Sequence, residues 1–219
     1  MPSAATLALF CTTALALLVV PGPAVLYIAG RSAAQGRRAG IVSVLGVHTG
    51  TVVHLLAAVA GLSAVLVASG AAFTLTRWLG GAYLIVLGVR TLARRPAETD
   101  ATVTLAPRPL RRLYRDGVVV NVLNPKTALF FLAFLPQFVQ PERAPVWCQT
   151  LVLGLVFIVL GLCSDGVYAL AGARAGQWLR TRPTTASLRR RRPTSQLAEG
   201  GLLVGLGITA LAVPTSRPT

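Results

Sequence analysis

The chain has 219 residues, of which 54% are hydrophobic and only 12% are charged, and its mean hydropathy is +0.67. Ordinary soluble domains are about 45 to 50% apolar, so the composition excludes that class and indicates an integral membrane protein. The formal net charge of +15 does not indicate a nucleic-acid-binding protein, because the basic residues lie in short segments between apolar runs.

Six sustained apolar runs follow one another along the chain, at residues 4–29, 40–68, 73–92, 117–139, 146–173 and 200–213. Each run is read as a membrane-spanning helix, with five helices as the alternative count because the last run is short and the fourth is interrupted. Three basic cytoplasmic loops are expected at 30–39, 93–116 and 174–199. The predicted fold class is an all-α integral membrane protein with six transmembrane helices, and residues 1–219 form a single transmembrane domain.

The first run has no basic segment before it and is followed by arginines, which is the opposite of the flanks of a cleaved signal peptide. We therefore expect it to remain as the first helix. Pro21-Gly22-Pro23 interrupts this helix, because neither proline has a backbone N–H to donate. Such a break within the hydrocarbon is tolerated only where the freed backbone groups face protein or a water-filled cavity.

The second run contains two histidines, His48 and His54. Six residues correspond to about 240° around a helix, so the two side chains do not share a face and do not form a two-histidine metal site. His48 is a candidate for carrying a proton, and the alternative is a packing histidine that is held by a hydrogen bond.

The fourth run has the only lysine of the chain, Lys126, near its middle, next to Asn124 and Pro125 and shortly after Asn121. An ammonium group inside the bilayer marks a functional site by default, because it is expensive unless it has a partner or faces water. Lys126 could bind a substrate carboxylate, or it could neutralise a buried carboxylate for structural reasons. Asn124 could be a ligand or could form the turn before the proline.

The fifth run carries Asp165, the only acidic residue deep inside a run. A carboxylate there is expected to be paired, protonated or solvated. Three roles remain open: binding the substrate amino group, relaying the coupling proton, and pairing with Lys126. At about 1.5 Å per helical residue, Pro23, His48, Lys126 and Asp165 lie roughly 12 to 16 Å from the arginines at the ends of their runs, and therefore in one layer near the midplane.

Arginine positions predict the orientation, since 17 of the 20 lie in the first, third and fifth connections. The positive-inside rule places these connections in the cytoplasm and both termini outside. Two sets of three spans would run in opposite directions, so a 3+3 inverted repeat is expected, with broken first and fourth helices as its best support. Three cysteines form no CxxC pair and are interpreted as packing residues: Cys11, Cys148 and Cys163.

Motifs along nearly the whole chain resemble the LysE/RhtB family of amino-acid exporters in order and spacing. The matching stretches are Pro21-Gly22-Pro23, Gly30-Arg31, Gly36 to Gly40, Leu79 to Leu84, Leu87-Gly88, Gly117 to Pro141 and Gly201 to Ala212. The chain departs from the family in a long basic loop from Arg180 to Gln196 and a brief tail after Val213. These departures leave the boundaries of the last span open.

The resemblance implies a multi-pass secondary transporter of the cell inner (plasma) membrane. It would export amino acids or close derivatives, driven by the proton motive force and without a cofactor, and the family does not choose among substrates. We expect no metal and no nucleic acid; the partners would be the small-molecule substrate and the lipid bilayer, and a homodimer is allowed by small-residue pairs such as Gly46/Gly50. The expected substrate-binding residues are Pro21, Gly22, Pro23, Asn121, Asn124, Pro125, Lys126 and Asp165, and the proton-coupling candidates are Asp165 and His48.

Two other functions are weighed against export. A transporter of another small metabolite or of a cation is expected to bury several carboxylates, and the sequence offers only Asp165. An intramembrane enzyme would use Asp165 with His48 or His54 as acid and base, and the sequence shows no second deep acid, serine-histidine pair or metal cluster to support it.

Overall fold

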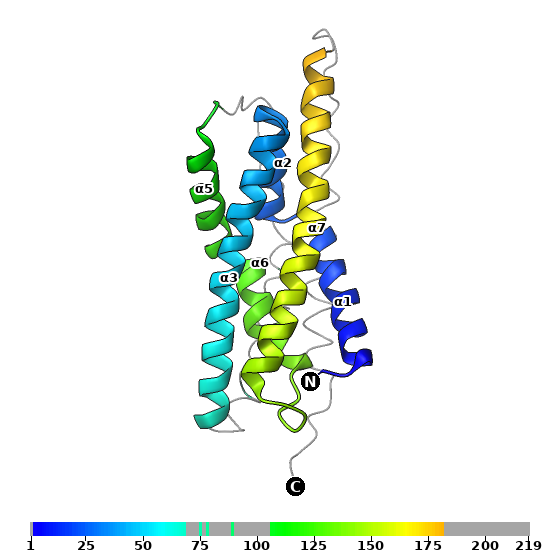
Figure 1. The fold of residues 1–219 in the computed structure, drawn as a ribbon, viewed down its shortest axis with the longest axis vertical. Helices are drawn as coiled ribbons and strands as arrows, with labels where there is room; N and C mark the ends of the chain where they lie inside the picture. Colours follow the sequence, from blue (N-terminus) through cyan, green and yellow to red (C-terminus); the bar gives the residue numbers. More distant parts are fainter. Residues whose placement is uncertain (1, 69–74, 76–77, 79–88, 90–105, 182–219) are drawn as a thin grey trace.

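The computed structural model describes residues 2–68, 75, 78, 89 and 106–181, and every regular element in these ranges is a helix (Figure 1). The expected third span at 73–92 lies almost entirely outside the described residues, and the sixth span at 200–213 lies wholly outside them. The all-helical prediction is thus confirmed for the described part of the chain, and the count of six helices and the 3+3 repeat stay predictions.

The first broken span consists of α1 (Ala4–Val19) and α2 (Pro23–Gln35), whose axes differ by 54°. Helix α1 begins where the Ser3 hydroxyl accepts a hydrogen bond from the Thr6 backbone N–H. It ends at Val19 because the prolines that follow supply no N–H donor, and α2 begins with Pro23 at its first position, where a proline is tolerated.

Helix α3 (Arg37–Ala68) follows α2 after the single residue Gly36. Gly36 has φ of +84°, a left-handed conformation that glycine adopts without a Cβ penalty. The loop expected at 30–39 is therefore wrong as a loop, since every residue in it except Gly36 is helical. A glycine C-cap is a compact turn, and the arginines on either side do not prevent helix formation.

The second broken span consists of α5 (Leu110–Val122), α6 (Pro125–Leu129), the π-helical turn η1 (Phe130–Phe134) and the 3₁₀ turn η2 (Leu135–Phe138). The part before the break and the part after it differ in direction by 48°. Helix α5 begins at Leu110, so residues 110–116 are helical and not part of the basic loop expected at 93–116. Apolar runs alone do not reveal the amphipathic first turns of such a helix.

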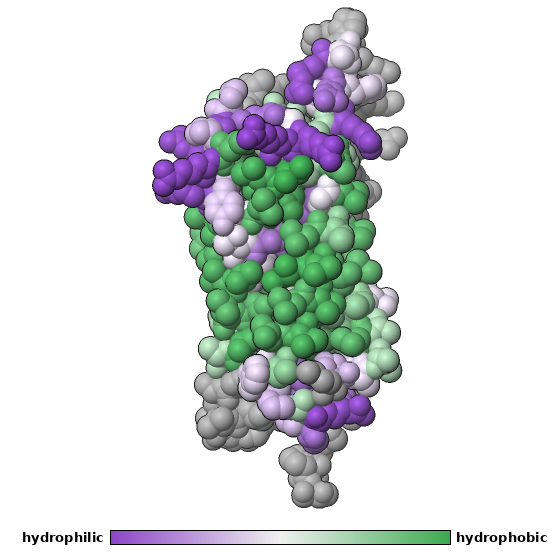
Figure 2. Space-filling view, in the orientation of Figure 1, coloured by the Kyte–Doolittle hydropathy of each residue, from purple (hydrophilic) through white to green (hydrophobic). Residues whose placement is uncertain are grey.

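Helix α7 (Val146–Thr181) is the longest element within the described residues and continues past residue 173, where a loop is expected from the sequence. Among the described residues, α3 and α7 are each long and apolar enough to cross a membrane, and the count rises to four if each bent pair is one span. Figure 2 shows a corresponding apolar band across the middle of the visible face, with polar residues toward both ends.

Arginine-bearing segments meet at the end of the bundle that is uppermost in Figure 1. Gln35 of α2 exchanges two hydrogen bonds with the backbone of Arg108, and the Arg180 guanidinium donates to the Ala33 carbonyl. Helix α1 begins at the opposite end, as does the turn between η2 and α7. Arginines from the first, third and fifth connections therefore share one end of the bundle.

Glycines allow the closest helix contacts. A Cβ on Gly46 would lie 2.2 Å from the Tyr114 carbonyl oxygen of α5, and one on Gly176 would lie 2.1 Å from the Ala33 carbonyl oxygen of α2. Phenylalanines fill the core between α1, η1, η2 and α7; its most closely stacked pair is Phe130 and Phe157, with ring centroids 4.1 Å apart. This aromatic cluster lies on the α1 side of the breaks.

Candidate functional site

The break in the first span leaves two adjacent carbonyl groups, those of Val19 and Val20, without helical donors. A continuous helix would bond them to residues 23 and 24, but Pro23 has no N–H and the chain changes direction before Ala24. Both carbonyl oxygens are instead bound by side chains: Tyr168 Oη of α7 donates to Val19 at 2.5 Å, and Lys126 Nζ of α6 donates to Val20. The two broken spans are thus joined directly at their breaks.

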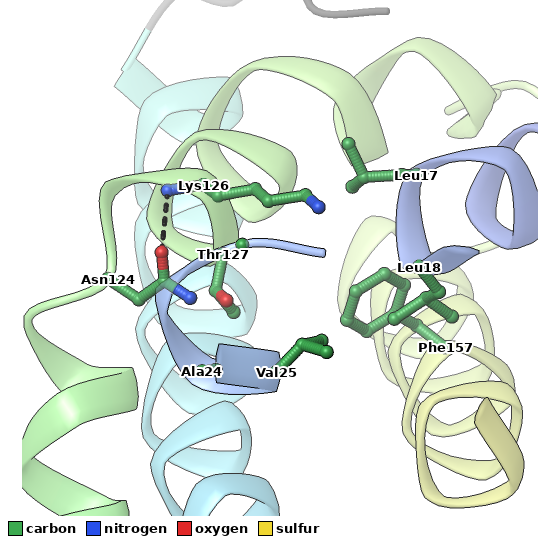
Figure 3. Close-up of a pocket in the computed structure, with 9 residues that line it drawn as sticks. Leu17, Leu18, Ala24, Val25, Asn124, Lys126, Thr127 and Phe157 are labelled. Carbon is green, nitrogen blue, oxygen red and sulfur yellow. Dashed lines mark hydrogen bonds between the residues drawn. The ribbon is translucent and has the colours of Figure 1, made fainter. Parts of the chain in front are cut away.

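A cavity of about 40 Å³ lies at this junction (Figure 3). Its polar lining comes from Asn124, Lys126 and Thr127 of the second break and from the backbone at Gly22 of the first. The Lys126 side chain extends across the cavity from one broken span toward the other in Figure 3. The remaining lining residues are apolar: Leu17, Leu18, Ala24, Val25 and Phe157.

The second break is held by two asparagines. Asn124 caps α6, because its side-chain oxygen accepts the Lys126 backbone N–H at 3.1 Å. The buried Asn121 amide donates to the Val47 carbonyl and to Thr51 Oγ1 of α3, each at 2.9 Å, and its oxygen accepts from Thr127 Oγ1 at 3.0 Å. Asn121 is therefore a fully bonded link between α3 and the break, and its side chain does not line the cavity.

Asp165 and His48 form a buried contact between α7 and α3, with Asp165 Oδ2 3.1 Å from His48 Nε2. The sequence leaves Lys126 open as a partner for Asp165; in the structure the partner of Asp165 is His48, and Lys126 contacts the Val20 carbonyl. Both roles proposed for His48 agree with this geometry, since a histidine held by a hydrogen bond also has a second nitrogen that can take a proton.

The two histidines serve different sites, which confirms that they do not share a helix face. His54 Nε2 lies 3.0 Å from the Asn121 carbonyl oxygen, and its imidazole stacks on Phe131 with ring centroids 6.3 Å apart. Within the described residues no group of three His, Cys, Asp or Glu side chains could hold a metal ion.

Sequence reasoning missed Tyr168, Thr127 and Thr51 as parts of the site. Tyr168 follows Asp165 by three residues and therefore lies on nearly the same face of α7, which is a usable signal once Asp165 has been chosen. Thr51 gives no such signal, because a threonine in an apolar helix commonly bonds to its own backbone, as Thr51 also does with Val47.

The expected site residues thus fall into three groups. Gly22, Asn124 and Lys126 line the cavity. Pro21, Pro23, Pro125 and Asn121 shape the breaks on either side of it. Asp165 and His48 form a separate pair, connected to the break through Tyr168 on the next turn of α7.

The chain is similar in sequence to known membrane and efflux proteins. The family model described as LysE type translocator matches residues 15–211. A homoserine/homoserine lactone efflux protein of Salmonella typhimurium is 32% identical over 172 residues, which cover 78% of this chain and 82% of the relative. An uncharacterized membrane protein of Vibrio cholerae is 30% identical over 78% of this chain and 83% of its own length, and a leucine efflux protein of Klebsiella pneumoniae is 25% identical over 78% and 81%. No solved structure matches the chain.

Proposed function

The chain belongs to the LysE type translocator family, and we propose that it exports a neutral amino acid or a close derivative across the cytoplasmic membrane, driven by the proton motive force. The family assignment makes it a multi-pass membrane transporter and not an enzyme. The choice of substrate class and of driving force rests on the residues around the breaks.

The contact of Lys126 with the first break carries the proposal. Broken helices that meet in the middle of a membrane supply freed backbone groups to a substrate, and an amino acid needs partners for both a carboxylate and an ammonium group. Lys126 offers an ammonium to the carboxylate, and the carbonyls of Val19 and Val20 offer acceptors to the substrate ammonium. Both kinds of partner lie within one hydrogen bond of each other.

The cavity lining favours a neutral side chain on the substrate. Lys126 is the one cation and no carboxylate appears among the described lining residues, whereas five of the nine lining residues have apolar side chains: Leu17, Leu18, Ala24, Val25 and Phe157. A second positive charge on the substrate would meet no acid there, and a second negative charge would compete for the same lysine. The two relatives with named substrates export homoserine or its lactone and leucine, which also lack a charged side chain.

His48 and Asp165 are the proposed proton carrier. With His48 neutral and Asp165 ionised the buried pair has a net charge of −1, and one added proton makes it neutral. His48 Nδ1 is buried and has no hydrogen-bond partner in the described part of the chain, so its lone pair is available to that proton. Lys126, Tyr168 and His54 are the other ionisable side chains near the breaks, and each of them bonds to a backbone carbonyl.

The cavity at the breaks is too small for an amino acid in this structure. A volume of about 40 Å³ is close to that of one water molecule, about 30 Å³, and far below the roughly 300 Å³ of a small ligand site. Substrate entry therefore requires the two broken spans to move apart.

Reconstituted vesicles test the proposal. With an imposed pH gradient, labelled leucine and homoserine should move across the membrane, and labelled lysine and glutamate should not. Lys126→Met should raise the KM about 10- to 100-fold, as expected for loss of a hydrogen bond to a charged group. Leu132→Ala, on the exposed side of the same broken span, is the matched control and should keep the KM. Transport of charged amino acids alone, or an unchanged KM in Lys126→Met, would contradict the proposal.

A further inference from the structure

The prolines that begin α2 and α6, Pro23 and Pro125, each leave one backbone carbonyl without its helical donor, and in both breaks a side chain from a long helix bonds to that carbonyl. Pro23 cannot donate to Val19, four residues earlier, and Pro125 cannot donate to Asn121. Tyr168 Oη of α7 bonds to Val19 at 2.5 Å, and His54 Nε2 of α3 bonds to Asn121 at 3.0 Å. The Asn121 carbonyl also accepts the Asn124 backbone N–H at 3.0 Å, so His54 adds a second donor there.

In both contacts, the long helix of one half of the chain bonds to the break in the other half. Helix α3 follows the first broken span in sequence but bonds to the second break, and α7 follows the second broken span but bonds to the first. Val19 ends α1, which lies in the lower half of the bundle in Figure 1, and Asn121 lies at the end of α5, in the upper half. The Tyr168 and His54 side chains are both half-buried.

From this arrangement we propose that Tyr168 and His54 are paired latches that control access to the cavity from opposite faces of the membrane. The Tyr168 latch holds the end of α1 against α7 and closes the face at which α1 begins. The His54 latch holds the end of α5 against α3 and closes the face at which α5 begins. Opening one latch at a time exposes the cavity to one face at a time, and the small cavity of about 40 Å³ belongs to the state in which both latches are formed.

Water explains why each latch can open without leaving an unpaired group. A carbonyl released into hydrocarbon would lack a partner, but one released into a hydrated cavity is bonded by water. Latch opening and water entry are therefore coupled. His54 also stacks on Phe131 of the π-helical turn η1, so it contacts the second broken span on both sides of its break.

The role of the latches rests on the proposed transport function, but the experiment that tests them needs no substrate. A reporter cysteine replaces Val25, which lines the cavity, in a protein whose Cys11, Cys148 and Cys163 are changed to alanine. A membrane-impermeant thiol reagent is then added to one face or the other of oriented vesicles, and the labelling rate is measured.

Tyr168→Phe should raise labelling from the face at which α1 begins about two- to tenfold, the population change that follows the loss of one net hydrogen bond. His54→Phe keeps the ring on Phe131 and should raise labelling from the opposite face by a similar factor. His54→Gln supplies a new N–H donor and should return labelling toward the starting rate.

Tyr27→Phe is the matched control, because the Tyr27 hydroxyl also donates to a backbone carbonyl, that of Leu113 in the regular part of α5, at 2.7 Å. It should leave labelling from both faces unchanged. Equal effects of Tyr168→Phe and Tyr27→Phe, or a rise on the same face for Tyr168→Phe and His54→Phe, would overturn the latches. Face-specific labelling in a protein that moves no amino acid would retain the latches and reject the substrate proposal instead.

Discussion

His48 Nε2 lies 3.1 Å from Asp165 Oδ2 although the two residues are 117 positions apart, and both side chains are almost completely buried. The contact ties α3 to α7 at the depth of the breaks. Gly161 of α7 makes room for the imidazole, since a Cβ there would lie 2.5 Å from His48 Cε1. The pair therefore places two ionisable side chains in direct contact inside the bundle.

Asp165→Asn should separate substrate movement from proton coupling. Asparagine keeps the size and a hydrogen-bonding group of the side chain but cannot be ionised, so a proton on His48 would no longer be balanced by a buried carboxylate. We expect accumulation driven by a pH gradient to be lost, and exchange of labelled for unlabelled substrate at equal pH to continue. His48→Gln should act in the same direction. Full pH-driven accumulation in both variants would remove the pair from the coupling mechanism.

A double-mutant cycle measures the strength of the contact. His48→Ala leaves an unpartnered buried carboxylate and should lower the free energy of unfolding more than the double change His48→Ala with Asp165→Ala does. Residues in direct contact typically show coupling energies of about 0.5 to 3 kcal/mol, and unfolding in detergent can resolve most of this range. Additive effects would show that the two side chains are neighbours without an energetic interaction.

Gly161→Ala should disturb the same pair without removing a charged group. The added methyl group would collide with the imidazole, and overpacking of this kind costs about 1 to 3 kcal/mol of stability. Gly166→Ala, five residues further along α7, is the control, because no atom of the described chain lies within 4 Å of the new Cβ. Thermal unfolding and pH-driven export of the two variants should differ, and equal behaviour would contradict the close fit at His48.

The breaks could be predicted from the sequence because their signal is local. A proline removes its own N–H whatever surrounds it, and Asn124 before Pro125 is a helix N-cap from its type alone. The partner of Asp165 could not be predicted in this way. Depth follows from counting residues along one helix, but contact also requires the rotation of α7 relative to α3, which depends on close packing at positions such as Gly161.

The connections show a second limit of the sequence. Arginines around Gly36 and before Gly117 suggest loops, because charge is expensive in hydrocarbon, but helices continue through charged residues once they leave it. Four helices extend past the apolar runs that predict them: α2, α3, α5 and α7. An apolar run therefore indicates which residues lie in the hydrocarbon, but it does not indicate where the helix begins or ends.

The orientation of the bundle can be tested with reporter fusions at two described turns. A fusion at Gly36 should report the cytoplasm, because it lies at the arginine-rich end, and a fusion at Glu142, in the turn before α7, should report the opposite face. Alkaline phosphatase, active only outside the cytoplasm, and a fluorescent protein, active only inside it, give complementary readouts. Cytoplasmic fluorescence from Glu142 would reverse the orientation.

Restoring a continuous first helix should abolish export without preventing membrane insertion. In the triple variant Pro21→Ala, Gly22→Leu, Pro23→Ala, residues 23 and 24 would carry N–H groups positioned to bond to Val19 and Val20. These bonds would replace those from Tyr168 and Lys126, straighten the 54° bend and place the leucine side chain where Gly22 now lines the cavity. Export is measured per molecule of protein found in the membrane.

The single change Leu26→Ala, on the exposed side of α2, is the control for insertion and should keep export. If the triple variant inserts and exports as well as the unchanged protein, the break is a packing feature and the substrate path lies elsewhere. If Pro23→Ala alone retains export while the triple variant loses it, the cavity lining at Gly22, rather than the freed Val19 carbonyl, is the part of the break that transport requires.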